Sequence, residues 1–238
     1  LGKTLNVPFK KVDDVLFNDR ALAMQVPYET EDAPVACHTI ASAQNAGWIW
    51  DIGLTSRRGV GHVYSSKFLS DEEAEQNLRN YLGDAANGLE ARKISFEPGH
   101  REQWWKGNCV AVGMAAGFVE PLEATAIMLV ELSARYIAEN LPADESLMPV
   151  VAKRFNTQMS YRWQRIVDFL KFHYMLTKRP EPYWQAHCDP KTFPESLKED
   201  IALWQYRGPT TNDFTSAMEL FPAASYQYVL YGMEFKPD

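Results

Sequence analysis

Two carboxylates three residues apart, Glu120 and Glu123, lie where an apolar segment gives way to a helical pattern. Residues 108–126, NCVAVGMAAGFVEPLEATA, predict a strand, a glycine-rich turn and then a helix. Pro121 suits the first position of that helix, where its missing N–H costs nothing. Because a helix start exposes unpaired N–H groups and a partial positive charge, this stretch could bind an anion beside a carboxylate.

Two interpretations of the glutamates stay open at this point. A glutamate in the first helical turn can be purely structural, since it complements the helix dipole, and this interpretation is favoured for Glu120 or Glu123 taken alone. Alternatively, Glu123 lies beside a bound ligand and accepts a proton or a hydrogen bond. Gly113 and Gly117 would let the backbone approach such a ligand closely, because neither carries a Cβ. Spacing does not decide between the two.

The histidines and cysteines show no pattern typical of a catalytic or metal-binding site. The five histidines lack metal-ligand spacing, so the sequence predicts no metal site. His173 is expected to pack within a long helix with its polar tip satisfied. The three cysteines, Cys37, Cys109 and Cys188, are far apart and odd in number, which favours a reducing compartment over a disulfide framework.

The elements that must position these residues change character along the chain. Short stretches rich in aromatic and β-branched residues predict strands at 22–28, 37–43, 47–54 and 59–66. A capping box of Ser70 and Glu73 begins a helix that ends at Gly83. Residues 94–114 return to extended structure, with CVAV (109–112) as a buried strand.

From Leu122 onward the pattern is helical. One face of the first helix carries four apolar residues, and another carries Glu131 and Arg135 as an i,i+4 pair; the apolar four are Ile127, Val130, Ala134 and Ile137. Residues 146–176 predict a long amphipathic helix with a break near Pro149, followed by a loop at 178–184. Two or three shorter helices are expected within 194–234. Strands first and helices last make the expected fold class mixed α/β.

Composition excludes several classes of partner. The chain of 238 residues has 24 Lys plus Arg against 31 Asp plus Glu, a net charge of −7, so no basic excess is available to neutralise nucleic-acid or membrane phosphates. The longest apolar run, 109–119, is roughly half of the ~20 residues that a membrane-spanning helix needs. We therefore expect neither nucleic acid nor membrane as a partner.

Two separate segments together closely resemble the flavin-dependent tryptophan halogenases. Residues 47–66, GWIWDIGLTSRRGVGHVYSS, resemble that family's Gly-Trp-x-Trp-x-Ile-Pro motif, and residues 108–126, NCVAVGMAAGFVEPLEATA, resemble its downstream segment with Glu-Pro-Leu-Glu. Residues 17–28 and 173–184 are also similar to this family, so the resemblance covers essentially the whole chain.

The resemblance implies part of an FAD-binding fold of the glutathione-reductase or flavin-monooxygenase type. Residues 1–105 would form a strand-rich region near flavin and substrate, residues 106–140 would close the FAD and halide site, and residues 141–238 would form a helical substrate-binding part. In the family, reduced FAD reacts with O₂, and the flavin hydroperoxide oxidises chloride or bromide to hypohalous acid. The acid then halogenates tryptophan, an indole or another electron-rich aromatic compound.

The resemblance also assigns roles to individual residues. Glu123 would be the catalytic glutamate near the substrate carbon, and the backbone N–H groups of Thr125 and Ala126 would hold the halide. Four residues would contact or shape the flavin pocket: Gly113, Met114, Pro121 and Ile127. Trp48 and Trp50 would line the passage between flavin and substrate; the alternative, that they are core aromatics of a strand, is less favoured.

The sequence departs from the family pattern at several positions. Gly53 replaces the proline of the tryptophan motif, and Asp51 occupies a position that is often basic or polar. Ala124 and Ala126 replace a serine and a glycine; alanine at 126 would hinder the halide site if that residue needed a positive φ. Phe221 aligns with an indole-clamping tryptophan of tryptophan-specific members, which suggests an aromatic substrate other than free tryptophan.

The same resemblance carries expectations about the whole protein. No GxGxxG motif is present, and we expect the dinucleotide-binding glycines and the catalytic lysine to precede Leu1, so that this segment alone is inactive. The parent enzyme would be a cytoplasmic homodimer that takes reduced FAD from a separate flavin reductase. Two alternatives remain: an FAD-dependent aromatic monooxygenase that hydroxylates without halide, and a non-catalytic flavin-binding homologue.

Overall fold

The computed structural model describes residues 1–216 and 218–236 and has the mixed α/β character that the sequence predicts. The chain forms two units, each built from separate ranges. Unit 1 comprises residues 1–16, 98–178 and 187–238, and unit 2 comprises residues 17–97 and 179–186. The sequence predicts three contiguous functional regions instead, 1–105, 106–140 and 141–238, and that division stays a prediction.

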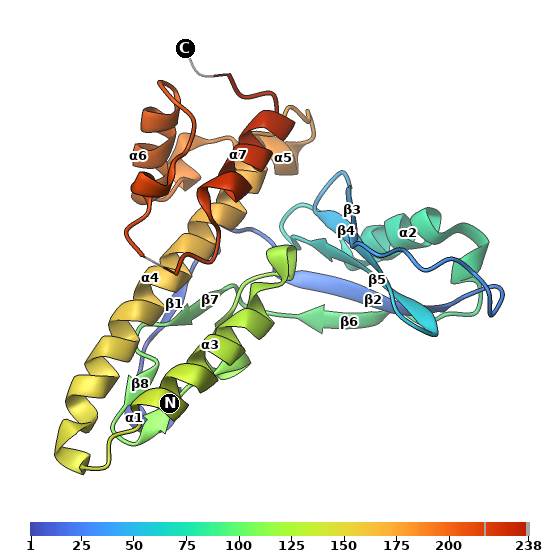
Figure 1. Ribbon diagram of the computed structural model, residues 1–238. Coiled ribbons are helices and arrows are strands. Elements are labelled where there is room, and N and C mark those ends of the chain that lie inside the picture. The colour runs from blue at the N-terminus through green and yellow to red at the C-terminus, as the bar shows by residue number, and fades with distance from the viewer. Residues whose placement is uncertain (217, 237–238) are drawn as a thin grey trace. The chain divides into compact units, whose positions relative to one another are not determined.

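Unit 2 contains a five-stranded antiparallel sheet in the order β3-β4-β5-β2-β6 (Figure 1). The strands are β2 (Arg20–Pro27), β3 (Ile40–Ala43), β4 (Trp48–Gly53), β5 (Arg57–Tyr64) and β6 (Arg92–Ser95). The four predicted strands of this region are confirmed, and β4 and β5 form a hairpin in which Gly53 pairs with Arg58.

Helix α2 (Asp71–Leu82) packs on this sheet through its buried face of Ala74, Leu78 and Leu82. Ser70 accepts a hydrogen bond from the Glu73 amide at 3.2 Å, the Glu73 carboxylate accepts one from the Ser70 amide at 3.0 Å, and Gly83 ends the helix with φ 59°. The capping box and the glycine stop are therefore as predicted. A 3₁₀ turn, η1 (Gly83–Ala86), follows.

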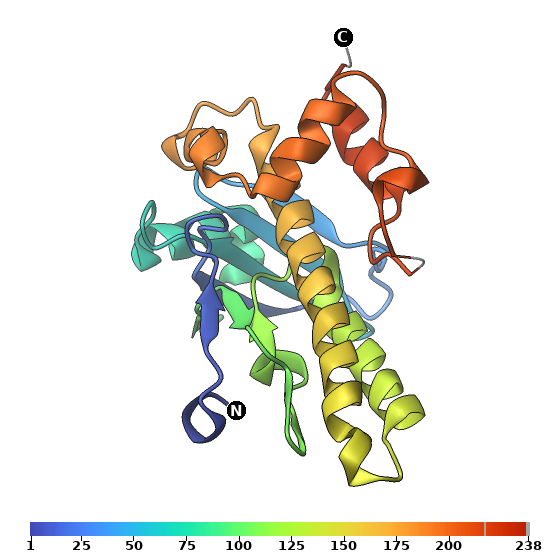
Figure 2. The same cartoon turned by 90° about the vertical axis from the view of Figure 1, so that its left-hand side faces the viewer.

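Unit 1 combines a small sheet with long helices. The sheet has the order β1 (Phe9–Lys11), β7 (Gly99–Arg101) and β10 (Gly117–Phe118), and β8 (Trp105–Lys106) pairs with β9 (Cys109–Val110). Helix α3 (Thr125–Asn140) lies beside the longest helix, α4 (Met148–Met175), as Figures 1 and 2 both show. The remaining elements of unit 1 are α1 (Gly2–Leu5), η2 (Gly113–Ala115), η3 (Leu122–Ala124), η4 (Glu145–Leu147), η5 (Pro190–Thr192), α6 (Glu195–Trp204), η6 (Thr211–Asp213) and α7 (Ala223–Gly232). Helix α5 (Pro182–His187) belongs to unit 2 except for its last residue.

Helix α4 supplies much of the core of unit 1. All six residues predicted to face inward are buried: Phe155, Met159, Ile166, Phe169, Leu170 and Tyr174. Pro149 lies in the first turn and does not break the helix, because an N–H is not needed there. The two shorter helices expected within 194–234 are α6 and α7.

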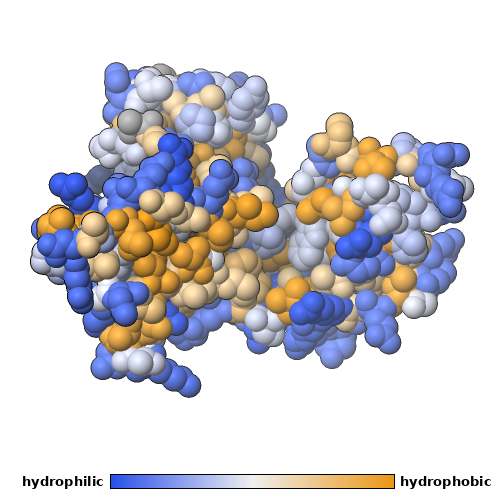
Figure 3. All heavy atoms as spheres, turned by 60° about the horizontal axis from the view of Figure 1, so that its bottom comes forward, coloured by the Kyte–Doolittle hydropathy of each residue, from blue (hydrophilic) through white to orange (hydrophobic). Residues whose placement is uncertain are grey.

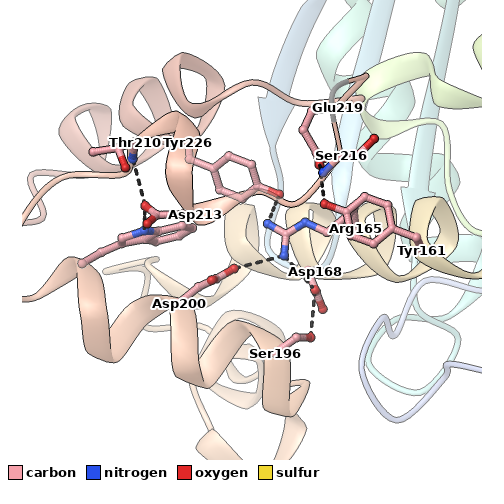
Figure 4. A network of polar contacts seen from close by, with 11 residues as sticks. Tyr161, Arg165, Asp168, Ser196, Asp200, Thr210, Asp213, Ser216, Glu219 and Tyr226 are labelled. Atoms are coloured by element: carbon pink, nitrogen blue, oxygen red, sulfur yellow. Dashed lines mark hydrogen bonds and ion pairs between the residues drawn. The ribbon is translucent and has the colours of Figure 1, made fainter.

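A buried polar network joins α4 to the C-terminal helices of unit 1 (Figure 4). Arg165 donates to the Asp200 carboxylate at 3.1 Å and to the Tyr226 hydroxyl at 2.9 Å. Asp168 accepts from the Ser196 hydroxyl at 2.8 Å, and its burial raises the pKa of its carboxyl to about 6. A charge in this interior needs such partners, so the network fixes how α6 and α7 meet α4.

Four more local predictions were wrong in detail. Only Cys109 and Val110 of CVAV form a strand, and both are half-exposed, because Gly113 with φ 61° turns the chain into η2. Residues 182–184 begin helix α5 instead of continuing a loop, since Pro182 suits the first helical position.

The other two errors concern helix α3. Its face with Ile127 and Val130 is exposed, and Thr125, Leu129 and Ser133 face the core instead. Arg135 pairs with Glu139 at 2.8 Å and not with Glu131. Met114, Leu147 and Val150 are further exposed apolar residues of unit 1. Figure 3 shows that apolar side chains gather on the face of the molecule that it presents.

Within residues 1–216 and 218–236, no helix has the length and hydropathy needed to cross a bilayer. No group of three His, Cys, Asp or Glu side chains in the same ranges could hold a metal ion.

Candidate functional site: the turn before helix α3

Two consecutive residues with left-handed backbone, Glu123 and Ala124, interrupt the start of the helix. Glu123 has φ 66° and ψ 4°, and Ala124 has φ 50° and ψ 29°. Pro121 therefore precedes the 3₁₀ turn η3 instead of opening α3, which begins four residues later at Thr125, so the prediction for Pro121 was wrong. Left-handed geometry is unfavourable for residues that carry a Cβ, and strain of this kind concentrates at functional sites.

The same turn gathers backbone N–H groups at the tip of α3. Ala124 is left-handed, whereas Thr125 has nearly mirror-image angles of φ −67° and ψ −19°. Such a pair points successive amides into one concavity, which suits a small anion. The Ala124 amide bonds to the Pro121 carbonyl at 3.1 Å, so Thr125 and Ala126 provide the amides of the first helical turn. Ala126 lies within α3 and has no positive φ, so alanine carries no backbone penalty there.

The Glu123 side chain contacts a histidine of helix α4. Its Oε1 lies 3.1 Å from Nε2 of His173, with the two side chains 37% and 22% exposed. The other ring nitrogen of His173, Nδ1, lies 2.8 Å from the Phe169 carbonyl oxygen one turn earlier. The sequence suggested that His173 would have a satisfied polar tip, but gave no sign that its partner would be Glu123.

Glu120 plays a different part from Glu123. It is 4% exposed, and its Oε1 accepts a hydrogen bond of 2.6 Å from the Tyr174 hydroxyl. The first glutamate of the motif therefore ties the end of β10 to α4, which supports the structural interpretation for this residue. Adjacent residues of α4, His173 and Tyr174, thus contact the two glutamates.

The residues assigned to the flavin wall lie around the same helix. A Cβ built on Gly113 would come 3.3 Å from Cγ2 of Val130 in α3, so η2 lies against that helix. Met114 and Ile127 are 80% and 78% exposed. Large apolar side chains with this degree of exposure can contact a ligand or another protein. Their assignment to the flavin stays a prediction.

Phe221, assigned to the substrate, connects to this site through aromatic rings. It is buried and stacks on Phe169 with ring centroids 4.0 Å apart. Phe169 in turn meets the His173 ring edge-on at 4.7 Å. A chain of ring contacts therefore runs from Phe221 to the histidine that touches Glu123. The sequence could not predict this chain, since it joins residues on separate elements.

Trp48 and Trp50 lie in unit 2, on the same face of strand β4. Trp48 is buried, and its ring meets that of Trp50 edge-on at 6.4 Å. Trp50 covers Gly61 of β5, where any Cβ would overlap its six-membered ring. These contacts fit the core interpretation, and the role in a passage is untested.

The two residues of β4 that depart from the family pattern, Asp51 and Gly53, are explained by their immediate neighbours. Asp51 is buried and accepts from the guanidinium of Arg58 and, at 3.1 Å, from the hydroxyl of Tyr81. This carboxylate raises the pKa of Arg58. Gly53 packs so close to Val35 that a Cβ would lie 2.9 Å from its Cγ1.

Comparison with known proteins identifies the family to which this chain belongs. The sequence model of the tryptophan halogenase family matches residues 1–238. The 7-chloro-L-tryptophan 6-halogenase KtzR of Kutzneria sp. (strain 744) is 37% identical over 232 residues, 98% of this chain and 45% of that protein. The crystal structure of a tryptophan halogenase from Shewanella frigidimarina NCIMB 400 superposes with a TM-score of 0.96 at 47% identity, over 100% of this chain and 46% of the other.

A flavin-dependent halogenase from Brevundimonas sp. BAL3, BrvH, superposes with a TM-score of 0.91 at 36% identity, again over 100% of this chain and 47% of the other. The chain thus spans about half the length of the relatives that it matches. With the whole chain matched by the family's sequence model and by its folds, this chain belongs to the tryptophan halogenase family.

Proposed function

We propose that this chain is the part of an FAD-dependent halogenase that supplies the halide site, the active-site glutamate and one wall of the flavin pocket. One observation carries the proposal: the left-handed backbone of Glu123 and Ala124 directly precedes the first-turn amides of α3, those of Thr125 and Ala126. The reaction is halogenation of tryptophan, an indole or another electron-rich aromatic compound.

The residues present fit a flavin and a small anion. Gly113, with φ 61° and no Cβ, permits close approach of a flat ring, and the exposed side chains of Met114 and Ile127 offer it an apolar surface. The Thr125 and Ala126 amides offer N–H donors to chloride or bromide. Bound FAD, once reduced by a separate flavin reductase, supplies the two-electron chemistry by which O₂ oxidises the halide.

Glu123 is the residue of this chain that acts on the substrate. Electrophilic halogenation replaces a ring hydrogen, so a proton must leave the carbon that receives the halogen. A carboxylate held beside that carbon accepts it, and the electrons of the C–H bond restore the aromatic ring. Phe221, linked to this site through Phe169, is proposed to bound the substrate pocket. A phenylalanine in place of an indole-clamping tryptophan favours a substrate other than free tryptophan.

The parent protein is proposed to work as a cytoplasmic homodimer. One alternative is hydroxylation without halide. It was supported by Ala126, because an alanine would hinder the halide site if that residue needed a positive φ. That support weakens, since Ala126 has ordinary helical geometry and its amide stays at the helix tip. A non-catalytic flavin-binding homologue would lack the upstream GxGxxG motif and lysine.

The test uses the parent protein that contains this segment, loaded with FAD and supplied with a flavin reductase. Product formation is measured on tryptophan and a panel of indoles, with chloride, bromide or neither. Halide-dependent product that falls at least about a hundredfold in Glu123→Gln supports the proposal, because a positioned acid–base group contributes roughly 10²–10⁴-fold. Hydroxylated product without halide, or wild-type turnover in Glu123→Gln, would reject it.

A further inference from the structure

The hydrogen-bonding geometry of His173 restricts where its protons lie. A carbonyl oxygen can only accept, so Nδ1, 2.8 Å from the Phe169 carbonyl, must carry a hydrogen. In a neutral ring with Nδ1 protonated, Nε2 is an acceptor. Yet Nε2 lies 3.1 Å from Oε1 of Glu123, which is also an acceptor when ionised.

The pair is therefore satisfied only when it holds one proton between Nε2 and Oε1. Either His173 is doubly protonated and donates to a carboxylate, or a protonated Glu123 donates to neutral His173. Without that proton two acceptors would face each other at 3.1 Å. With it, Oε1 is occupied, and among the residues that the structure describes none bonds to Oε2 of Glu123.

His173 and Glu123 each have a further structural constraint besides their contact with each other. Phe169 meets the His173 ring edge-on, with centroids 4.7 Å apart and planes at 84°. The backbone of Glu123 is left-handed and lies directly before α3. The imidazole therefore limits the carboxylate to one orientation, which is what efficient proton transfer requires.

We propose that His173 is a positioning residue for Glu123, which it orients through a shared proton so that Oε2 takes the proton of the halogenated ring carbon. In that step, which starts from the form with an ionised Glu123 and a doubly protonated His173, the C–H electrons return to the ring, the proton moves to Oε2, and Nε2–H continues to donate to Oε1. The extra proton is then released to water. This inference rests on the proposed function and adds His173 to it.

The test compares three variants of the FAD-loaded parent protein with wild type. His173→Phe keeps a flat ring but removes both nitrogens, whereas His173→Gln keeps a donor at the reach of Nε2. Tyr174→Phe is the matched control, because it removes a hydrogen bond from the next residue of α4 without touching Glu123. Each is assayed for kcat and KM, and for the kinetic isotope effect on an indole deuterated at the halogenated carbon.

We expect His173→Phe to lower kcat roughly ten- to a hundredfold with little change in KM, and to unmask a primary isotope effect as proton removal becomes slow. His173→Gln should recover most of kcat, and Tyr174→Phe should show no new isotope effect. Wild-type kcat in His173→Phe, or the same isotope effect in Tyr174→Phe, would overturn the inference. Absence of halide-dependent product from wild type would instead reject the proposed function.

A second measurement does not depend on turnover. Selective ¹⁵N labelling of histidine in the parent protein reports which ring nitrogens of His173 carry hydrogen, with His173→Gln giving the assignment. We expect Nδ1 to be protonated and the Nε2 signal to shift in Glu123→Gln. A ring with hydrogen on Nε2 alone, or an Nε2 signal indifferent to Glu123→Gln, would contradict the pairing.

Discussion

The hydrogen bond between Tyr174 and Glu120 gives a sharp prediction about stability. The Tyr174 hydroxyl donates to Oε1 at 2.6 Å, and the two residues are 3% and 4% exposed. Removing one partner of a buried hydrogen bond costs about 1–3 kcal/mol. Tyr174→Phe should therefore lower the free energy of unfolding by about 2 kcal/mol, because the carboxylate keeps its burial and loses a donor.

A double-mutant cycle with Glu120→Gln isolates this bond from the other effects of each substitution. Urea unfolding of the parent protein, followed by tryptophan fluorescence, should give a coupling free energy of about 1–3 kcal/mol. Tyr136→Phe is the control, because the Tyr136 hydroxyl donates to the neutral carbonyl of Val151 at the longer distance of 3.4 Å. This substitution should lower the free energy of unfolding by about 0.5 kcal/mol or less. A coupling below about 0.5 kcal/mol would refute the structural role assigned to Glu120.

Three further predictions concern the two units. Gly61→Ala should destabilise unit 2 by about 1–3 kcal/mol, since its Cβ would overlap Trp50, whereas Gly59→Ala meets no atom closer than 4.0 Å and should change the melting temperature little. Ser70→Ala removes the cap of α2 and should cost about 1 kcal/mol in chemical denaturation. Because burial raises the pKa of Asp168 from 3.8 to about 6, its contribution to stability is present below pH 3.8 and lost as pH rises through 6. This corresponds to roughly 3 kcal/mol, so unfolding free energies of wild type and Asp168→Asn should diverge with pH across that range; parallel curves would contradict the assignment.

Local signals allowed much of the fold to be predicted. Helix α2 was predicted with its cap and its stop because Ser70, Glu73 and Gly83 act on their own neighbours. The strands of unit 2 were predicted because short stretches rich in aromatic and β-branched residues are punctuated by glycine and proline. The buried face of α4 followed from a helical period over 28 residues.

Predictions that depend on long-range packing were the ones that failed. The apolar face of Ile127 and Val130 resembles a core face in sequence, but the core of unit 1 takes the side with Leu129. Likewise, α3 was expected to begin at Pro121, because nothing local announces left-handed backbone at Glu123 and Ala124. That geometry is unfavourable on its own and needs the surrounding fold to hold it.

In the candidate site, too, local features were predictable and long-range contacts were not. Spacing predicted a glutamate and free amides near a helix start, but the partner of that glutamate, His173, lies 50 residues later on α4. Two residues of one motif, Glu120 and Glu123, proved to have different surroundings, one buried against Tyr174 and one half-exposed beside His173. Only the three-dimensional arrangement separates their roles.

The most direct test of the central claim is the position of a bound halide. Crystals of the FAD-loaded parent protein soaked in bromide should show an anomalous peak within hydrogen-bonding distance of the Thr125 and Ala126 amides. Bromide found elsewhere, with those amides bonded to protein or water, would contradict the claim that the tip of α3 is the halide site.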